Sequence, residues 1–154
     1  MVQSINLVKQ KIEELPNNIE AEQSIIGSIM VSNEIFDDIN MLVRSINFHD
    51  PMHQKIFGAI EKLIYGGMLA NPITLKSYFE NEKSELNIPD YLVKITKFST
   101  SSRQAIEYSK LIYDLFVKRE LIKITKFATS SRQSIEYSKI IYDMYVRRQL
   151  IKIS

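Results

Sequence analysis

Residues Leu92–Ile124 read LVKITKFSTSSRQAIEYSKLIYDLFVKRELIKI, and residues Leu121–Ile153 read LIKITKFATSSRQSIEYSKIIYDMYVRRQLIKI. The second copy follows the first at an offset of 29 residues, and the two copies share the joint Leu121–Ile124. Of the 33 aligned positions, 25 are identical, and most of the eight differences preserve size or charge. This internal repeat has to be recognised before any element is assigned, because it changes the fold that the sequence predicts.

Each copy of the repeat places apolar residues at helical spacing, with charged residues between them. The apolar stripe recurs at steps of three, four, three and seven residues, which is one face of a helix. Arg119 and Arg148 interrupt the stripe at equivalent positions. A Thr-Ser-Ser triplet precedes each run, and its hydroxyl groups can accept hydrogen bonds from the first helical turn. We therefore predict helices over residues 103–127 and 132–153, with a hairpin interface made of Tyr108, Ile112, Leu115, Ile122, Tyr137, Ile141, Met144 and Ile151.

The joint at residues 125–131 decides whether these two helices form one rod or fold back on each other. An offset of 29 residues corresponds to about 2,900° at about 100° per residue, which is within about 20° of whole turns. A continuous rod would therefore carry both stripes on one face and leave that face for a partner chain. A break at Ala128–Ser131 would let the second helix bury its stripe against the first. We favour the break and an antiparallel hairpin, while the lack of Gly and Pro in the joint leaves the rod open.

The residues before the repeat predict a small head made of short helices. Residues 1–14 are expected to be a loosely held leader. Asn18 is a suitable N-cap for a helix that ends near Val31, with Glu20 and Glu22 in its positive first turn. Gly27 lies inside this helix, where glycine costs about 1 kcal/mol relative to alanine, so we expect another helix to approach it closely.

Four further helices are predicted in the head. Ser32 or Asn33 is expected to cap the first, in which Ile35, Phe36, Ile39 and Val43 face inwards. Asp50 and Pro51 form a cap and first-turn pair for a helix Pro51–Tyr65, which a Gly-Gly pair ends. Thr74 is expected to cap a short helix that runs through Phe79. A last short helix, Tyr91–Phe98, leads to the repeat. The sequence thus predicts an all-α fold: a small orthogonal helical bundle at residues 15–98, followed by the helical hairpin at residues 99–154.

The composition of the chain excludes several classes of protein. It has 154 residues, of which 45% are hydrophobic and 25% charged, as is ordinary for one globular domain. It contains no cysteine, so disulfides and thiolate chemistry are excluded. No apolar run is long enough to cross a bilayer, and the first residues lack the apolar core of a signal peptide. We therefore expect a cytoplasmic protein without membrane contact.

The net charge of +2 is unevenly distributed along the chain. Residues 1–91 carry a net charge of −6, and residues 92–154 carry a net charge of +8. A basic helical region can contact nucleic acid or an acidic protein surface. It can equally be a solvated helix face, which is the more common case. Direct DNA binding therefore has only weak support.

Residues that could carry chemistry are few. His49 and His53 have an i, i+4 spacing that can bind zinc, but Pro51 begins a helix between them and Asp50 is expected to cap it. Two histidines at a helix start are therefore the preferred interpretation. The serines of the Thr-Ser-Ser triplets have no nearby base. We predict no catalytic, cofactor-binding or metal-binding residues.

Several separated motifs in the head carry a resemblance to a known family. The segment LPNNIEAEQSIIGSIM, with Pro16, Ala21, Glu22 and Gly27, resembles the opening signature of the N-terminal domain of DnaB-type replicative DNA helicases. The motifs that follow in the family's order are Phe48 with His53-x-x-Ile56-Phe57, then Ile73-Thr74-Leu75, Tyr91-Leu92, and Ile106, Tyr108 and Ile112. The resemblance covers about residues 15–124. The family has a Gly-Gly turn where this chain has Asn87–Asp90.

The resemblance implies a role in DNA replication through contacts with other proteins. Family members pair through their helical hairpins, form the collar of a hexameric ring and contact primase. Their chains continue into a linker and a RecA-like motor, whereas this sequence enters a second copy of the first hairpin helix. The alternative is a free-standing or degenerate helical interaction protein derived from a truncated helicase gene.

The first prediction is that these 154 residues have no ATPase or strand-unwinding activity. Nucleotide hydrolysis in the family needs a GxxxxGK[ST] loop that holds phosphates, and this pattern is absent from the sequence. ATP and Mg²⁺ would enter only through a motor domain. The measurement is ATP turnover by the pure chain with and without single-stranded DNA. Turnover that DNA stimulates would contradict the prediction.

Overall fold

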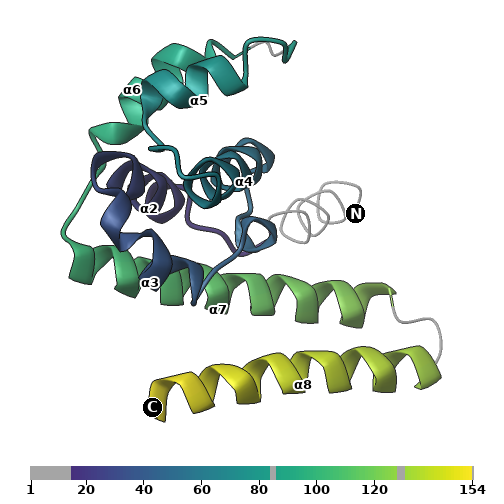
Figure 1. Cartoon of the computed structure of the whole chain (residues 1–154). Coiled ribbons are helices and arrows are strands. Elements are labelled where there is room, and N and C mark those ends of the chain that lie inside the picture. The colour runs from purple at the N-terminus through teal and green to yellow at the C-terminus, as the bar shows by residue number, and fades with distance from the viewer. Residues whose placement is uncertain (1–14, 84–85, 128–130, 154) are drawn as a thin grey trace. The chain divides into compact units, whose positions relative to one another are not determined.

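The computed structural model describes residues 15–83, 86–127 and 131–153, and the predicted leader at residues 1–14 lies outside them. The described residues form helices and no strands, which confirms the all-α prediction of a bundle followed by a hairpin (Figure 1). The helices are α2 (Ile19–Val31), α3 (Phe36–Asn40), α4 (Pro51–Tyr65), α5 (Pro72–Tyr78), α6 (Ile88–Thr96), α7 (Ser102–Phe127) and α8 (Ser131–Ile153), with 3-10 turns η1 (Asn33–Ile35) and η2 (Ser45–Asn47).

The chain divides into two compact units, which we describe separately. The head unit comprises residues 18–114, and therefore includes the first half of α7. Of the described residues, the hairpin unit comprises the rest of α7 from Leu115, α8 and residues 15–17. Among the described residues, no helix is long and apolar enough to cross a membrane.

The core of the head unit lies between α2, α3, α4 and α6. Three phenylalanines are almost completely buried in it, and the rings of Phe48 and Phe57 lie 4.9 Å apart between centroids. The ring of Phe36 lies 6.0 Å from that of Phe57 between centroids. Isoleucines from α2, α3 and α4 fill the space around these rings: Ile25, Ile26, Ile29, Ile39, Ile56 and Ile60. Ile25 and Ile26 lie four and three residues before Ile29 in α2, and Ile56 lies four residues before Ile60 in α4, which puts them on one face of each helix.

Side-chain caps fix where the head helices begin. The Asn18 side chain accepts a hydrogen bond from the Ala21 N–H at 2.9 Å, and Asp50 accepts from the Met52 N–H at 2.7 Å, as predicted. The prediction that Thr74 caps the next helix was wrong. Asn71 caps it instead, because its side chain reaches the N–H groups of residues 73 and 74, and Pro72 fills the first helical position.

Helix α6 begins three residues earlier than predicted. Asn87 is its N-cap and accepts a hydrogen bond from the Asp90 N–H, and Pro89 lies in the first turn. The polar segment before Tyr91 was interpreted as a loop because asparagine, proline and aspartate are typical of turns. The same residues also start helices, which explains the error.

The break between α6 and α7 is held by two serines of α2. The Ser24 hydroxyl donates to the Phe98 carbonyl at 2.9 Å, and the Ser28 hydroxyl accepts from the Thr100 N–H at 2.9 Å. Helix α7 then begins at Ser102, with the Ser101 hydroxyl accepting from the Gln104 N–H. The predicted start at residue 103 is therefore correct to within one residue.

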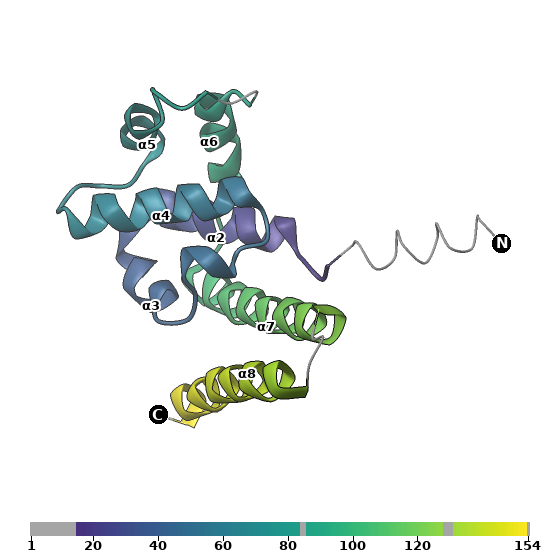
Figure 2. The ribbon, with the colours of Figure 1, turned by 90° about the vertical axis from the view of Figure 1, so that its right-hand side faces the viewer.

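In the hairpin unit the end of α7 and the whole of α8 run antiparallel, as both Figure 1 and Figure 2 show. Helix α7 ends at Phe127 and α8 begins at Ser131, so the predicted break, and not the rod, is present. Arg119 is almost completely buried, and its guanidinium donates to the Pro16 carbonyl at 2.9 Å within this unit.

Gly27 in α2 generates the second prediction. A Cβ atom at Gly27 would lie 2.3 Å from the Ile95 carbonyl oxygen of α6, so the predicted close approach of a second helix is confirmed. We expect Gly27→Ala to lower the free energy of unfolding by at least about 2 kcal/mol, because the two helices must separate. Urea unfolding followed by circular dichroism measures this change.

Gly58 of α4 is the matched control. A Cβ atom there would meet nothing closer than the Ser45 Cβ at 3.9 Å. Gly58→Ala should therefore stabilise the helix by about 0.5–1 kcal/mol through its better propensity. Equal effects of the two substitutions would show that the contact between α2 and α6 is loose.

Candidate interaction surfaces

A carboxylate buried in the head unit joins α2 to the segment before α4. Glu22 lies in the first turn of α2, and its side chain has no solvent exposure. One carboxylate oxygen accepts a hydrogen bond from the His49 N–H, and the other accepts from the Asp50 N–H at 3.2 Å. A buried charge needs such donors, because burying it unpaired would cost several kcal/mol.

His53 connects this carboxylate to α6. Its Nδ1 lies 2.7 Å from Glu22 Oε2, and its Nε2 lies 2.7 Å from the Tyr91 hydroxyl. A carboxylate can only accept, so Nδ1 carries a proton. The Tyr91 hydroxyl also accepts a hydrogen bond from the Gln23 amide at 3.2 Å. The rings of His53 and Tyr91 are nearly parallel, with an angle of 8° between their planes and 6.1 Å between their centroids.

We call Glu22, Gln23, His53 and Tyr91 the polar centre of the head. It ties the first turns of α2, α4 and α6 to one another, and His53 and Glu22 are closed to solvent. This burial makes the polar centre a structural element and not a place where a substrate can react. Among the described residues there is also no group of three or more His, Cys, Asp or Glu that could hold a metal ion.

Sequence reasoning singled out Glu22, His53 and Tyr91, but it missed Gln23 and the connection between these side chains. Glu22 was assigned to the first turn of its helix, and His53 to a helix start. Both assignments are correct, but neither shows that the two side chains are buried against each other. The available signal was the position of Glu22 between Ala21 and Ser24, on the same face as the core isoleucines of α2.

The predicted hairpin interface has a mixed environment. Ile112 in the head unit is fully buried, and Ile141 in the hairpin unit is 8% exposed. Leu115 and Met144 are half-buried, and Tyr108 is a half-buried residue that lines a hollow beside the start of α2. Ile122, Tyr137 and Ile151 are exposed. The role of these residues as an interface stays a prediction.

The hairpin unit contains an apolar groove between the end of α7 and α8. Its volume is about 370 Å³. Phe116 and Ile124 line it from α7, and Tyr137, Ile141 and Met144 line it from α8, while Glu120 and Lys123 border it. We call this the hairpin groove. A groove of this size between two helices is large enough to receive apolar side chains of another chain.

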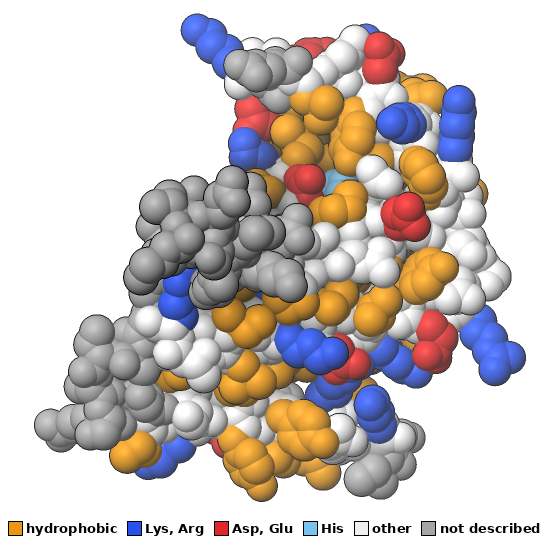
Figure 3. Space-filling view, turned by 180° about the vertical axis from the view of Figure 1, so that it is seen from behind, with side chains coloured by type: hydrophobic (Ala, Val, Ile, Leu, Met, Phe, Trp, Pro, Cys, Tyr) orange, Lys and Arg blue, Asp and Glu red, His pale blue; other side chains and the backbone are white. Residues whose placement is uncertain are grey.

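The outer face of α8 is a second apolar surface of the hairpin unit. Ile135 is 57% exposed and Tyr142 is 67% exposed, and a shallow hollow of about 470 Å³ lies between them. Lys139 and Asp143 border this hollow. Figure 3 shows one side of the molecule, where apolar side chains lie open among basic ones. Exposed apolar side chains that gather on one helix indicate a contact with another protein.

Exposed apolar side chains gather where α4 ends and α5 begins, at residues 66–73 of the head unit. We call this segment the head loop. Met68, Leu69 and Ile73 are 55%, 69% and 78% exposed. Gly67 has a φ of 75°, which only glycine adopts readily, and it lets the chain turn out of α4. The head loop therefore projects three large side chains into solvent.

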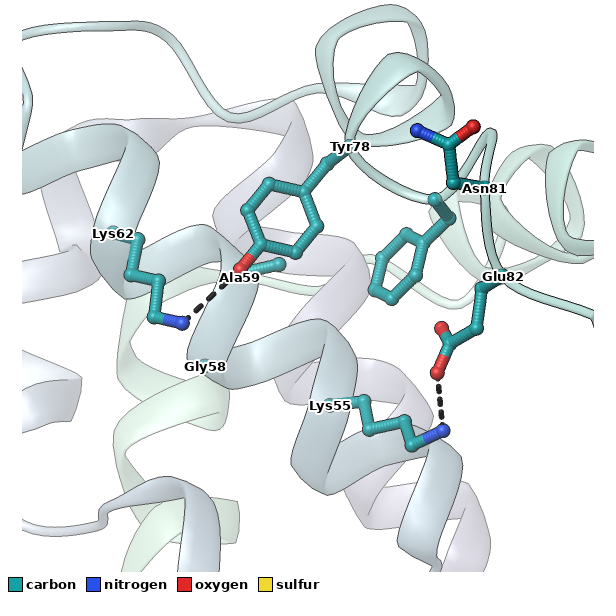
Figure 4. A pocket seen from close by; sticks show the side chains of 8 residues that line it. Lys55, Gly58, Ala59, Lys62, Tyr78, Asn81 and Glu82 are labelled. Carbon is teal, nitrogen blue, oxygen red and sulfur yellow. Dashed lines mark hydrogen bonds and ion pairs between the residues drawn. The ribbon is translucent and has the colours of Figure 1, made fainter.

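A hollow lies between α4 and the end of α5, the two helices that the head loop connects (Figure 4). Its two lysines already have partners. Lys55 forms an ion pair with Glu82, and Lys62 donates to the Tyr78 hydroxyl at 3.1 Å. The ion pair offsets the charge of Lys55, so this hollow is a weak candidate for an anionic ligand.

The third prediction concerns Tyr91. Burial raises the pKa of its hydroxyl above the ordinary value of 10.0; the hydrogen bond from Gln23 lowers it, and the charges of Asp50 and Glu22 raise it. We expect Tyr91→Phe to destabilise the head by about 1–3 kcal/mol at pH 8, because it leaves the His53 Nε2 without its partner. Tyr78→Phe, at an exposed position, is the control and should change stability by less than about 0.5 kcal/mol.

The pH dependence has a defined sign. A raised pKa in the folded state means that the contribution of Tyr91 is fully present below the unfolded pKa of about 10 and is lost as pH rises through the folded value. The difference between wild type and Tyr91→Phe in urea unfolding should therefore shrink above about pH 10. A constant difference would contradict the assignment.

Comparison with known proteins places this geometry in one family. Residues 14–114 match the family model described as the DnaB-like helicase N-terminal domain. The replicative DNA helicase DnaB of Rickettsia typhi is 41% identical over 107 residues, and that of Rickettsia felis is 39% identical over 107 residues. Each alignment covers 68% of this chain and 22% of the relative. The chain thus spans about a fifth of the length of the curated relatives it matches.

A solved structure shows the same fold. The crystal structure of the N-terminal domain of DnaB helicase from Mycobacterium tuberculosis aligns with a TM-score of 0.71 and 21% sequence identity. The alignment covers 84% of this chain and 99% of that chain. The matched residues contain the whole polar centre and the three helices that it joins. This chain belongs to the family of DnaB-like helicase N-terminal domains.

Proposed function

We propose that these residues serve a replicative DNA helicase as its self-associating N-terminal domain, in the collar of the ring. The observation that carries the proposal is the apolar outer face of α8, where Ile135 and Tyr142 are more than half exposed. Family membership supports self-association in general. In this proposal, ATP and Mg²⁺ would be used only by a motor domain outside the matched residues. The proposed location is the cytoplasm.

The outer face of α8 is suited to pairing with itself. Lys139 and Asp143 lie one helical turn apart on it, so two antiparallel copies would bring each lysine next to the aspartate of the other copy. The same arrangement would place the ring of Tyr142 over the alkyl chain of the partner's Lys139. Such a contact is isologous, because both copies use the same residues.

Contact with primase is a further part of the proposal. It is supported by membership of the DnaB-like family and by the presence of exposed apolar surfaces in both units. A co-sedimentation assay with a primase tests it, and variants of the head loop and of α8 would show which unit makes the contact.

Direct DNA binding is a second candidate function. Residues 115–154 hold nine lysines and arginines and three acidic residues, a net charge of +6. Phosphate contacts would make binding fall steeply as salt rises. A fluorescence titration with labelled single-stranded DNA at two salt concentrations tests this candidate.

The fourth prediction tests pairing through α8. We expect Ile135→Asp to weaken self-association about tenfold or more, because a charge would be buried between two apolar faces. Sedimentation velocity over a range of protein concentrations measures the change. Ile46→Asp is the matched control, since Ile46 is 66% exposed in the head unit. If both substitutions leave association unchanged, α8 is not the contact.

A further inference from the structure

We propose that the head loop of one copy inserts Met68, Leu69 and Ile73 into the hairpin groove of a second copy. This contact is separate from the α8 pairing proposed above, because it uses neither Ile135 nor Tyr142. It assigns a binding partner to two surfaces of the chain at once: a projecting apolar loop on the head unit and an apolar groove in the hairpin unit.

The backbone of the head loop is held in place on both sides. The Asn33 side chain donates to the Ala70 carbonyl and accepts from the Ala70 N–H, each at 2.8 Å. The Thr74 hydroxyl donates to the Leu69 carbonyl at 2.8 Å and accepts from the Asn71 N–H at 3.0 Å. A loop whose polar groups are satisfied in this way loses little further conformational entropy when it binds.

The large apolar side chains of the head loop are not covered by the core of the head unit. Ala70, which lies between the exposed residues and Asn33, is fully buried, whereas Leu69 and Ile73 are 69% and 78% exposed. A rigid backbone that turns large apolar residues outward is typical of a recognition element on a scaffold. A partner that covers these side chains needs an apolar surface able to enclose them.

The hairpin groove has the required shape and lining. Phe116 and Ile124 form one wall, and Ile141 and Met144 form the other, around a volume of about 370 Å³. The half-buried state of Met144 is useful here, because a flexible thioether chain adapts to the side chains that enter. A clamped apolar loop that enters an apolar groove is a common form of hot spot.

Charge favours the same pairing. Residues 18–114 hold nine basic and 13 acidic residues, a net charge of −4. Residues 115–154 have a net charge of +6. Head and hairpin units of different copies therefore attract each other at long range.

The proposed contact is heterologous, because each copy contributes a loop to one neighbour and a groove to another. Repetition of such a contact produces a closed ring when the rotation between copies closes, and an open filament when it does not. Together with an isologous contact through α8, it would give each copy two different kinds of neighbour.

Cross-linking between two single-cysteine chains tests the contact. The chain has no cysteine of its own, so Leu69→Cys in one chain and Tyr137→Cys in a second, tagged chain are the only reactive thiols. Both positions are exposed, and Tyr137 lines the hairpin groove. We expect a short bismaleimide to give the mixed dimer at high protein concentration. Val93→Cys is the control for Leu69→Cys, because Val93 is 52% exposed on α6, and its yield should be several-fold lower.

A second measurement uses association without cross-linking. Leu69→Lys should weaken association about tenfold or more, because it removes a leucine that is buried only in the complex. Val93→Lys should leave association unchanged. Both variants should keep the melting temperature of the wild type, since both positions are exposed in the single chain.

The outcomes separate this contact from the α8 pairing. A Tyr142→Cys chain that cross-links to itself, together with equal yields from Leu69→Cys and Val93→Cys, would overturn the loop–groove contact and leave the α8 pairing intact. The mixed dimer of Leu69→Cys and Tyr137→Cys, without any Tyr142→Cys homodimer, would overturn the α8 pairing and support the loop–groove contact. Cross-linking of residues 69 and 137 only within a doubly substituted chain would also overturn the proposal.

Discussion

The structure depends first on the buried hydrogen bond between Glu22 and His53. Its two side chains have no solvent exposure, and their nitrogen and oxygen atoms lie 2.7 Å apart. Because each buried polar atom would be costly alone, the first turns of α2 and α4 can be placed only where this pair forms. Tyr91 extends the same requirement to α6. The apolar core supplies most of the driving force, and the polar centre selects one arrangement of the helices.

The close contact of α2 with α6 follows from this arrangement. Gly27 removes the side chain that would hold the two helices apart, and Ser24 and Ser28 satisfy the backbone where α6 ends. Helix α2 therefore makes three kinds of contact along its length. It carries Glu22, it allows Ile95 of α6 to approach at Gly27, and it bonds the backbone of the break before α7. The same residues that pack the head also fix where the long helix starts.

The sequence was sufficient for most of the fold, for reasons that are local. The helical spacing of the repeat predicted α7 and α8, and Asn18 and Asp50 marked the starts of α2 and α4, because caps act within three residues. The error at Thr74 arose where two residues could each cap a helix, and the error at Tyr91 arose because the residues that start α6 are also typical of turns. The polar centre could not be predicted in the same way, because it joins residues 31 and 38 positions apart in the chain. The exposed head loop was equally hidden, since apolar residues in a sequence do not show whether a core covers them.

The repeat explains why apolar side chains of α8 are exposed. Helix α7 carries Ile106, Ser109 and Tyr113, which are half-buried or fully buried in the structure. The equivalent residues of α8 are Ile135, Ser138 and Tyr142, and all three are exposed. The duplication copied a helix whose first half is packed in the head unit, but it did not copy the rest of the head. Since each exposed apolar side chain leaves about 1.5–3 kcal/mol of burial unrealised, the second copy creates a free-energy gain that only another protein surface can supply.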